Sequence, residues 1–328
     1  MEEHALNLKS GLTEIHVERD AEAMGRATAS FIAGAMKEAV ARGERPVLWL
    51  MAAPSGFAFY GAFVELARKD AALAAMCRQA AWFQFDDYPV PRGDPRFPIT
   101  FRHLLETRFF GPLREACGAL KDIHLLEIGG ADDERVCRDY ARFLIETAEN
   151  PGNCLIQLKG IGMDGHWGFH GHETPLDAPP AVIKVAMNEA NIHQQKLDWP
   201  EYFRNNEDLP RYACTCDVQL FLKARIIVDN VPQASKMYSV LATYVNEDVC
   251  GAIPSSALKT HPNSHAFLTK ESAGALLEYR EALARDPAAK ISPSLLSRLE
   301  SVWASEDKVP QADNRAAMRA VLSELRML

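Results

Sequence analysis

Short apolar segments alternate with helix-like segments along almost the whole chain, and this alternation limits the possible folds more than any other feature. Several apolar segments are continuous, as in PVLWLMA (46–52), WFQF (82–85) and CLIQLKG (154–160). Such strands are buried on both faces, which is typical of a parallel sheet covered by helices. The sequence therefore predicts an α/β fold, a three-layer doubly wound sandwich with a mainly parallel sheet and helices on both faces.

The remaining elements follow the same pattern. Further strands of the sheet are predicted at 123–127, 181–186, 212–218, 224–229 and 265–269, and helices at about 20–42, 57–69, 99–110, 132–148 and 233–244. We expect one α/β domain over residues 1–289 and a C-terminal helical extension over 290–328. The polar segment 188–211 has little periodicity, and we interpret it as a lid over a site.

Composition and charge exclude some classes of partner. The 36 basic and 44 acidic residues give a net charge of −8, which offers no general attraction to nucleic acid or to an anionic membrane. No segment has the apolar length of a signal peptide or a membrane span, so we expect a cytoplasmic protein. Its seven cysteines are scattered through apolar segments, which favours reduced core thiols over disulfides.

The loop after the strand at 154–160 has an unusual composition. It reads GIGMDGHWGF over 160–169, with four glycines, Asp164 and His166. Glycine permits sharp turns and close approach to a ligand, and a carboxylate near an imidazole can fix its tautomer and support its charge. The alternative is a tight turn in which the aspartate caps a helix and the histidine faces solvent. Because ligands of open parallel sheets bind beyond the carboxyl ends of the strands, we favour a catalytic loop.

Two other strand ends should lie at the same edge of the sheet. The strand at 82–85 leads into Asp86-Asp87-Tyr88, where a desolvated carboxylate would have a raised pKa and could abstract a proton next to a carbonyl. Taken alone, such a pair is more often a helix cap or a turn than a base, and the base interpretation depends on its convergence with the histidine loop. The strand at 46–52 leads into a small-residue turn with Ser55, which could bind phosphate at a helix N-terminus or simply be an N-cap.

A metal site is an alternative interpretation of the histidine-rich loop. His166, His170 and His172 lie close to Glu173, and imidazole and carboxylate groups at short spacing can hold zinc. Supporting carboxylates elsewhere in the sequence are not evident. We therefore expect neither a metal nor a cofactor.

These loops together resemble the glucosamine-6-phosphate deaminase/isomerase family, which shares its fold with 6-phosphogluconolactonases. The resemblance rests on GIGMDGHWGF, on FDDYPVPRGDPRFPITFRHLLETRFFGPL (85–113) and on VPQASKMYSVL (231–241). It covers roughly residues 15–285 in matching order. The family converts an aminosugar phosphate to a ketose phosphate and ammonia without a cofactor, and its members are often oligomeric, so the resemblance implies a sugar-phosphate substrate and a homo-oligomer.

The resemblance also implies roles for individual residues. Asp86 falls on the base that moves a proton between C1 and C2 of the ring-opened sugar, and Asp164 and His166 fall on the pair that assists ring opening. Lys236 matches the lysine of the phosphate site, and Lys196 lies near the lid arginine of the family. The candidate substrate- or phosphate-binding set is Ser55, Gly56, Asp87, Gly165, Lys196 and Lys236.

The sequence departs from the family pattern at two positions. Counting directly, Gly171 stands where the family has a glutamate that completes a triad with the aspartate and histidine. We expect Glu173 to take this role through a two-residue insertion, with His170 or His172 as alternatives. In the phosphate loop, Pro54 removes a backbone N–H that could donate to phosphate.

Three functions remain open at this stage. A deaminase or aldose-ketose isomerase is favoured because Asp86-Asp87-Tyr88 and Phe169 are retained. A lactonase of the 6-phosphogluconolactonase type would use the histidine to activate water and would not need the base. A non-catalytic sugar-phosphate sensor would need Ser55 and Lys236 but neither Asp86 nor His166.

Overall fold

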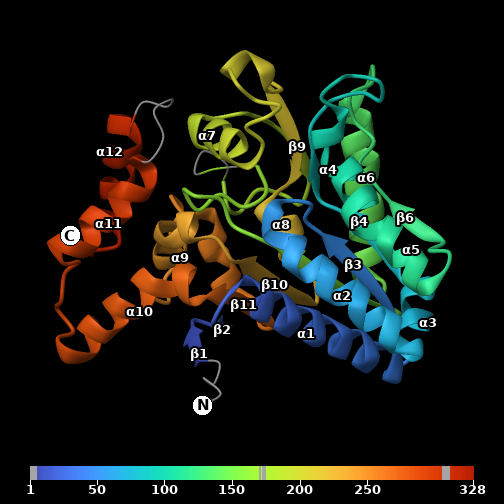
Figure 1. The fold of residues 1–328 in the computed structure, drawn as a ribbon, viewed down its shortest axis with the longest axis horizontal. Coiled ribbons are helices and arrows are strands. Elements are labelled where there is room, and N and C mark those ends of the chain that lie inside the picture. The colour runs from blue at the N-terminus through green and yellow to red at the C-terminus, as the bar shows by residue number, and fades with distance from the viewer. Residues whose placement is uncertain (1–5, 170, 172–174, 305–310) are drawn as a thin grey trace.

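An eight-stranded sheet forms the centre of the computed structural model, which describes residues 6–169, 171, 175–304 and 311–328 (Figure 1). The strand order is β1-β2-β11-β10-β7-β3-β4-β6, and every neighbouring pair is parallel except β1 with β2. The strands are β1 (Leu6–Ser10), β2 (Thr13–Glu18), β3 (Arg45–Leu50), β4 (Ala81–Gln84), β6 (Asp122–His124), β7 (Asn153–Lys159), β10 (Ile226–Val231) and β11 (Ser264–Thr269).

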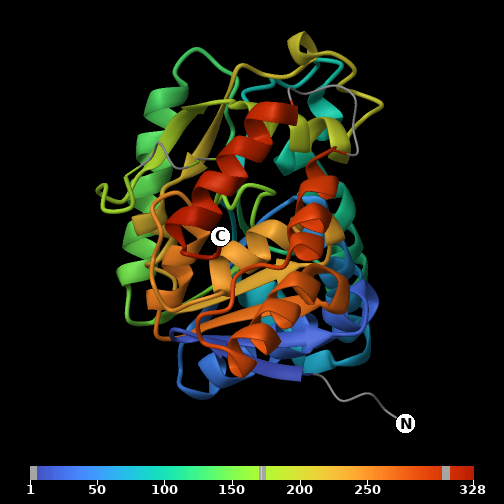
Figure 2. The same ribbon diagram turned by 90° about the vertical axis from the view of Figure 1, so that its left-hand side faces the viewer.

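Helices pack around this sheet, so the predicted α/β fold is confirmed (Figures 1 and 2). The helices of the core are α1 (Ala21–Ala41), α2 (Phe57–Lys69), α3 (Ala71–Gln79), α4 (Phe101–Leu105), α5 (Gly111–Cys117), α6 (Asp133–Glu149), α7 (Glu189–Asp198), α8 (Val218–Phe221), α9 (Met237–Tyr244) and α10 (Lys270–Arg285). The side chains of Asp20, Asp70 and Asp132 accept backbone N–H groups at the N-termini of α1, α3 and α6. Such caps satisfy donors that a helix cannot pair internally.

A second, three-stranded sheet corrects one prediction. The segments predicted at 181–186 and 212–218 do form strands, β8 (Val182–Ala186) and β9 (Tyr212–Cys216), but they do not join the main sheet. They pair antiparallel with each other, and β9 also pairs with β5 (Asp86–Asp87). The strands differ in burial: Lys184 and Ala186 of β8 are exposed, whereas all six residues of β10 in the main sheet are buried. A partly exposed strand suits a small antiparallel sheet that is open to solvent, because strands of a covered parallel sheet must be apolar on both faces.

Other elements were not expected from the sequence. The N-terminal strands β1 and β2 and the short helix α3 had not been predicted, and the stretch at 99–110 divides into α4 and a π-helical turn at Glu106–Phe110. The C-terminal segment forms α11 (Pro293–Ala304) and α12 (Gln311–Glu324), drawn in red in Figures 1 and 2. Leu295 and Leu299 of α11 and Met318 and Leu322 of α12 are buried in the hydrophobic core, which attaches these helices to the domain.

Two further findings concern the helices and the cysteines. None of the helices in the described part of the chain combines the length and hydropathy needed to cross a bilayer. All seven cysteines are buried as free thiols.

Candidate functional site

The loops after β3, β4 and β7 line one cavity at the carboxyl edge of the sheet. These loops supply Ser55, Asp86 and His166, and helix α7 and the turn before α9 close the cavity from the other side. Its volume is about 40 Å³. The lining residues are Met51, Ala53, Ser55, Phe85, Asp86, Phe101, Gly160, Ile161, Gly162, His166, Gly168, Phe169, Gln194, Gln195 and Lys236.

Two glycines of GIGMDGHWGF are required by close contacts of the loop that carries His166. A Cβ atom at Gly162 would lie 2.0 Å from Cε1 of the His166 ring, so only glycine leaves room for the imidazole. Gly165 has a φ of +91°, a conformation that side chains disfavour, and a Cβ there would contact Ile253 at 2.8 Å. The backbone N–H of Gly162 donates to the carbonyl of His166 at 3.0 Å, which closes the turn. The loop thus folds around the imidazole ring.

Asp164 orients His166. Nδ1 of His166 lies 2.6 Å from Oδ1 of Asp164, and the same oxygen accepts the backbone N–H of His166 at 3.2 Å. Burial acts to raise the pKa of Asp164, but the charge of His166 and the hydrogen bonds from it outweigh burial and lower the pKa. An ionised Asp164 holds the proton of the imidazole on Nδ1. Nε2 of His166 is then free to accept or return a proton.

Asp86 is a buried carboxyl group with an unused oxygen. Only 3% of the residue is exposed, and Oδ1 has no hydrogen-bond partner among the described residues. Burial, and to a lesser degree the neighbouring Asp87, raises the pKa of Asp86 well above its ordinary value. A carboxyl group in this environment can exchange a proton with a group placed in the cavity.

Asp87, in contrast, belongs to the packed interior. It accepts the backbone N–H groups of Tyr88, Phe101 and Arg102 at 2.7, 2.7 and 3.0 Å, and it pairs with the Arg102 guanidinium at 2.9 Å. Asp87 is not among the residues that line the cavity. Its contacts hold the start of α4 against β5.

Ser55 and Lys236 lie together at one side of the cavity. Nζ of Lys236 donates to Oγ of Ser55 at 3.3 Å, and the Ser55 hydroxyl donates to Gln233 at 2.9 Å. Only 4% of Lys236 is exposed, and burial lowers its pKa, against the opposing effect of Asp198. A buried ammonium group beside a hydroxyl group can bind an anion such as phosphate.

The structure places Gly56 differently from its predicted role at a phosphate. Its backbone N–H donates to the carbonyl of Ala53 at 2.9 Å, and it does not line the cavity. A Cβ at Gly56 would lie 2.9 Å from the Tyr60 ring. The glycine therefore gives Tyr60 room to pack.

Helix α7 covers the cavity within the segment interpreted as a lid. Gln194 accepts the backbone N–H of Met163 at 3.1 Å, and Asn191 donates to the carbonyl of Phe169 at 2.9 Å. Both bonds tie α7 to the loop that carries His166. Lys196 lies on the same helix, is half-buried, and does not line the cavity.

Gln194 and Gln195 had not been singled out from the sequence. The sequence offered one signal, the helical spacing of this segment. Residues two apart on a helix point to nearly opposite sides, so the spacing limits which of them can share a face but does not say which one lines the cavity. Gln194 and Lys196 therefore could not both face the cavity. Of the predicted catalytic group, Glu173 and its alternatives His170 and His172 lie outside the described residues.

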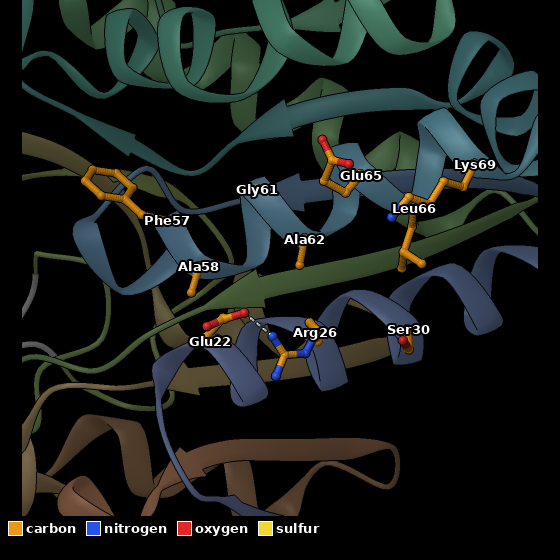
Figure 3. Close-up of a pocket in the computed structure, with 10 residues that line it drawn as sticks. All are labelled: Glu22, Arg26, Ser30, Phe57, Ala58, Gly61, Ala62, Glu65, Leu66 and Lys69. Atoms are coloured by element: carbon orange, nitrogen blue, oxygen red, sulfur yellow. Dashed lines mark hydrogen bonds and ion pairs between the residues drawn. The ribbon is translucent and has the colours of Figure 1, made fainter.

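A larger groove of about 590 Å³ lies between α1 and α2 (Figure 3). Arg26 and Glu22 form an ion pair on its α1 side, and Phe57 stands at one end. None of the candidate site residues lines it. The smaller cavity is therefore the candidate site, because it combines a desolvated carboxyl group, an oriented imidazole and a buried ammonium group.

No family model matches the sequence. Curated proteins do: the chain is 28% identical over 192 residues to a glucosamine-6-phosphate deaminase of Shouchella clausii, covering 58% of this chain and 71% of the relative. It is also 28% identical over 215 residues to the glucosamine-6-phosphate deaminase of Bacillus velezensis, covering 65% of this chain and 82% of the relative.

Solved structures show the same fold. A monomeric glucosamine-6-phosphate deaminase superimposes with a TM-score of 0.66 at 21% identity, over 79% of this chain and 98% of the other. The 6-phosphogluconolactonase of Trypanosoma brucei superimposes with a TM-score of 0.59 at 14% identity, over 82% and 99% of the two chains. The chain is thus a relative of the glucosamine-6-phosphate deaminases, with the fold that they share with 6-phosphogluconolactonases.

Proposed function

We propose that this protein is a sugar-phosphate aldose-ketose isomerase and deaminase that converts glucosamine 6-phosphate, or a related aminosugar phosphate, to a ketose phosphate and ammonia. The observation that carries the proposal is the pairing of two groups in one cavity. Asp86 presents a buried carboxyl oxygen that no described residue pairs with, and His166 presents an imidazole that Asp164 orients. Similarity to curated glucosamine-6-phosphate deaminases supports the same reaction.

In the proposed reaction, His166 moves a proton to and from the ring oxygen, which opens the sugar. The Asp86 carboxylate then removes the proton from C2 and returns it to C1, so that the aldose becomes a ketose imine. Water adds to C2, the bond between C2 and nitrogen breaks, and ammonia leaves. One carboxylate suffices for the intramolecular proton transfer, and among the described residues that line the cavity Asp86 is the one carboxyl group.

Lys236 and Ser55 are proposed to bind the phosphate group. They lie 3.3 Å apart beside the cavity, and the carbonyl of Ser55 accepts the Asn230 side chain at 2.8 Å, which fixes the loop. The cavity of about 40 Å³ has room for only a few water molecules, whereas small-molecule sites span roughly 300–1,000 Å³. The proposal therefore includes an opening of the cavity, and we assign it to α7, whose Gln194 and Gln195 line the cavity and would lie against the bound sugar.

The proposal is tested with a panel of substrates. Glucosamine 6-phosphate should release ammonia, and 6-phosphogluconolactone should hydrolyse no faster than it does without protein. Acid release from the lactone without ammonia from the aminosugar would establish the lactonase alternative. A higher melting temperature with sugar phosphate but no turnover of either compound would establish the sensor.

Glu173 is proposed to complete the ring-opening group with Asp164 and His166. If so, Glu173→Gln slows ring opening but leaves the transfer between C1 and C2 intact. We expect single-turnover rates measured with substrate pre-equilibrated to a higher open-chain fraction to recover in part. Equal losses with both substrate preparations would remove Glu173 from this role.

A further inference from the structure

A cluster of two histidines and a glutamate lies on the main sheet, apart from the cavity. Glu14 and His16 alternate along β2 and point to the same face, whereas Ile15 and Val17 are buried on the other. His265 lies on the neighbouring β11, paired in register with Glu14. The two strands adjoin near the β1 edge of the sheet (Figure 1).

The separations of the three groups suit a metal ion. Nε2 of His16 lies 3.4 Å from Nδ1 of His265, and that nitrogen lies 3.6 Å from Oε2 of Glu14. All three ligand atoms lie within 4.8 Å of one another. In a tetrahedral site with bonds of about 2.0–2.1 Å, any two ligand atoms are roughly 3.4 Å apart.

Hydrogen bonds donated to two asparagine side chains determine which imidazole nitrogens carry a lone pair. Nδ1 of His16 lies 2.9 Å from Oδ1 of Asn7, and Nε2 of His265 lies 3.0 Å from Oδ1 of Asn263. An amide oxygen only accepts, so each of these nitrogens carries the hydrogen. The other two nitrogens therefore face each other with lone pairs at 3.4 Å. Histidines that bind metals are oriented in this way by a carbonyl on the far nitrogen.

The surrounding aromatic rings hold the imidazoles in place. His16 stacks on Phe267 with ring centroids 4.5 Å apart, and Phe31 of α1 packs on His265 at 4.3 Å. The Glu14 side chain is 59% exposed, which leaves an approach from solvent. The site is thus preformed on two strands with one side open.

We propose that Glu14, His16 and His265 bind a divalent transition-metal ion of the zinc class, with water in the fourth position. Two imidazoles select such an ion over magnesium or calcium, which prefer oxygen ligands. None of the three residues lines the candidate active site. The ion would link β2 to β11, two strands from opposite ends of the chain, and its role is structural.

The test uses the full-length protein after dialysis against a chelator. Cobalt(II) is added as a spectroscopic probe, and we expect visible absorption of a tetrahedral site that saturates at one equivalent and is removed by zinc. Zinc should also raise the melting temperature. Absence of binding up to about 100 µM of either ion would overturn the proposal.

Substitutions of Glu14 and His265 test whether the cobalt absorption arises from the cluster on β2 and β11. Glu14→Gln should weaken binding at least tenfold, and His265→Gln should abolish it. If His265→Gln fails to fold, the exposed Glu14 still decides the question, because its replacement disturbs no packing. His124→Gln, a half-buried histidine outside the cluster, is the matched control and should bind normally.

The histidines of the catalytic loop are the main competing ligands. A variant with both His170→Ala and His172→Ala should retain the cobalt spectrum and the stoichiometry. Loss of the spectrum in this variant, together with an unchanged spectrum in Glu14→Gln, would assign the metal to the loop and refute the sheet site.

Discussion

Asp86 and Asp87 are adjacent, equally buried and part of the same short strand, yet their surroundings are opposite. Asp87 accepts three backbone N–H groups and pairs with Arg102, and it also accepts the side chain of Gln84 at 3.0 Å. Asp86 lines the cavity, and one of its oxygens has no partner in the part of the chain that the structure describes. Paired burial makes one carboxylate a structural group, whereas unpaired burial leaves the other available for proton transfer.

The same contrast recurs farther along the sheet. Lys159 at the end of β7 lies 3.3 Å from Asp229 of β10, and Tyr244 donates to the same aspartate. Lys236 is also buried, but its nearest hydrogen bond is to the Ser55 hydroxyl beside the cavity. The buried charges of Lys159 and Asp229 neutralise each other, whereas the ammonium group of Lys236 beside the cavity remains available to bind an anionic ligand.

The largest expected effect is on turnover in Asp86→Asn. We expect kcat to fall about 10²- to 10⁴-fold, because the amide cannot act as a base, while sugar-phosphate affinity stays within a few-fold. Steady-state kinetics and ligand titration measure the two quantities. Turnover close to that of the wild type would remove Asp86 from the base role.

The complementary change is Asp87→Asn, which should act on stability. It removes the buried counter-charge of the Arg102 guanidinium, which keeps only the half-exposed Glu127 at 3.6 Å. We expect a loss of about 3 kcal/mol in the free energy of unfolding. Urea denaturation measures this loss, with the exposed Asp139→Asn as the control. If Asp87→Asn leaves the unfolding midpoint unchanged, the distinction between the two aspartates fails.

Lys236→Met tests the proposed phosphate contact. Removing an ammonium group that binds substrate and transition state alike should raise KM about 10- to 100-fold with a smaller change in kcat. Lys223→Met, which removes an ammonium group paired with Glu149 far from the cavity, is the matched control. A fall in kcat at constant KM would instead place Lys236 in the chemical step.

The smallest expected effect is the pH dependence of stability in Asp86→Asn. The pKa of Asp86 is raised in the folded state, so the folded protein binds this proton more tightly than the unfolded chain does. The free energy of unfolding therefore decreases as the pH rises above the pKa that Asp86 has in the unfolded chain. The variant should therefore be more stable than the wild type at pH 7, and the difference should vanish below about pH 4. Urea midpoints across this range measure it, and a difference that grows toward low pH would contradict the assigned direction.

Much of the fold follows from local patterns in the sequence. Continuous apolar strands between helices predict the parallel sheet, since such strands can be buried only under two helical layers. Because the carboxyl ends of parallel strands lie at the same edge of a sheet, Ser55, Asp86 and His166 are expected together at that edge. The assignment of β8 and β9 to that sheet was wrong, because a strand's partner depends on which edges are free in three dimensions.

The site was less accessible to sequence reasoning than the fold. Gly56 resembles a phosphate-binding glycine in the sequence, but its contacts with Ala53 and Tyr60 form only when the chain turns into α2. The cluster of Glu14, His16 and His265 was not foreseen, since its histidines are 249 residues apart. No local sequence motif predicts a contact between two residues so far apart in the chain.

The sequence by itself determined most of the strands and helices of the core and the chemical groups that follow the strands at 46–52, 82–85 and 154–160, because both depend on local periodicity and on neighbouring residues. Only the tertiary structure decided which of those groups are neutralised by partners and which are left unpaired. The physical reason is that desolvation and pairing depend on residues far apart in the chain: Arg102 for Asp87, Asp229 for Lys159, and His265 for His16.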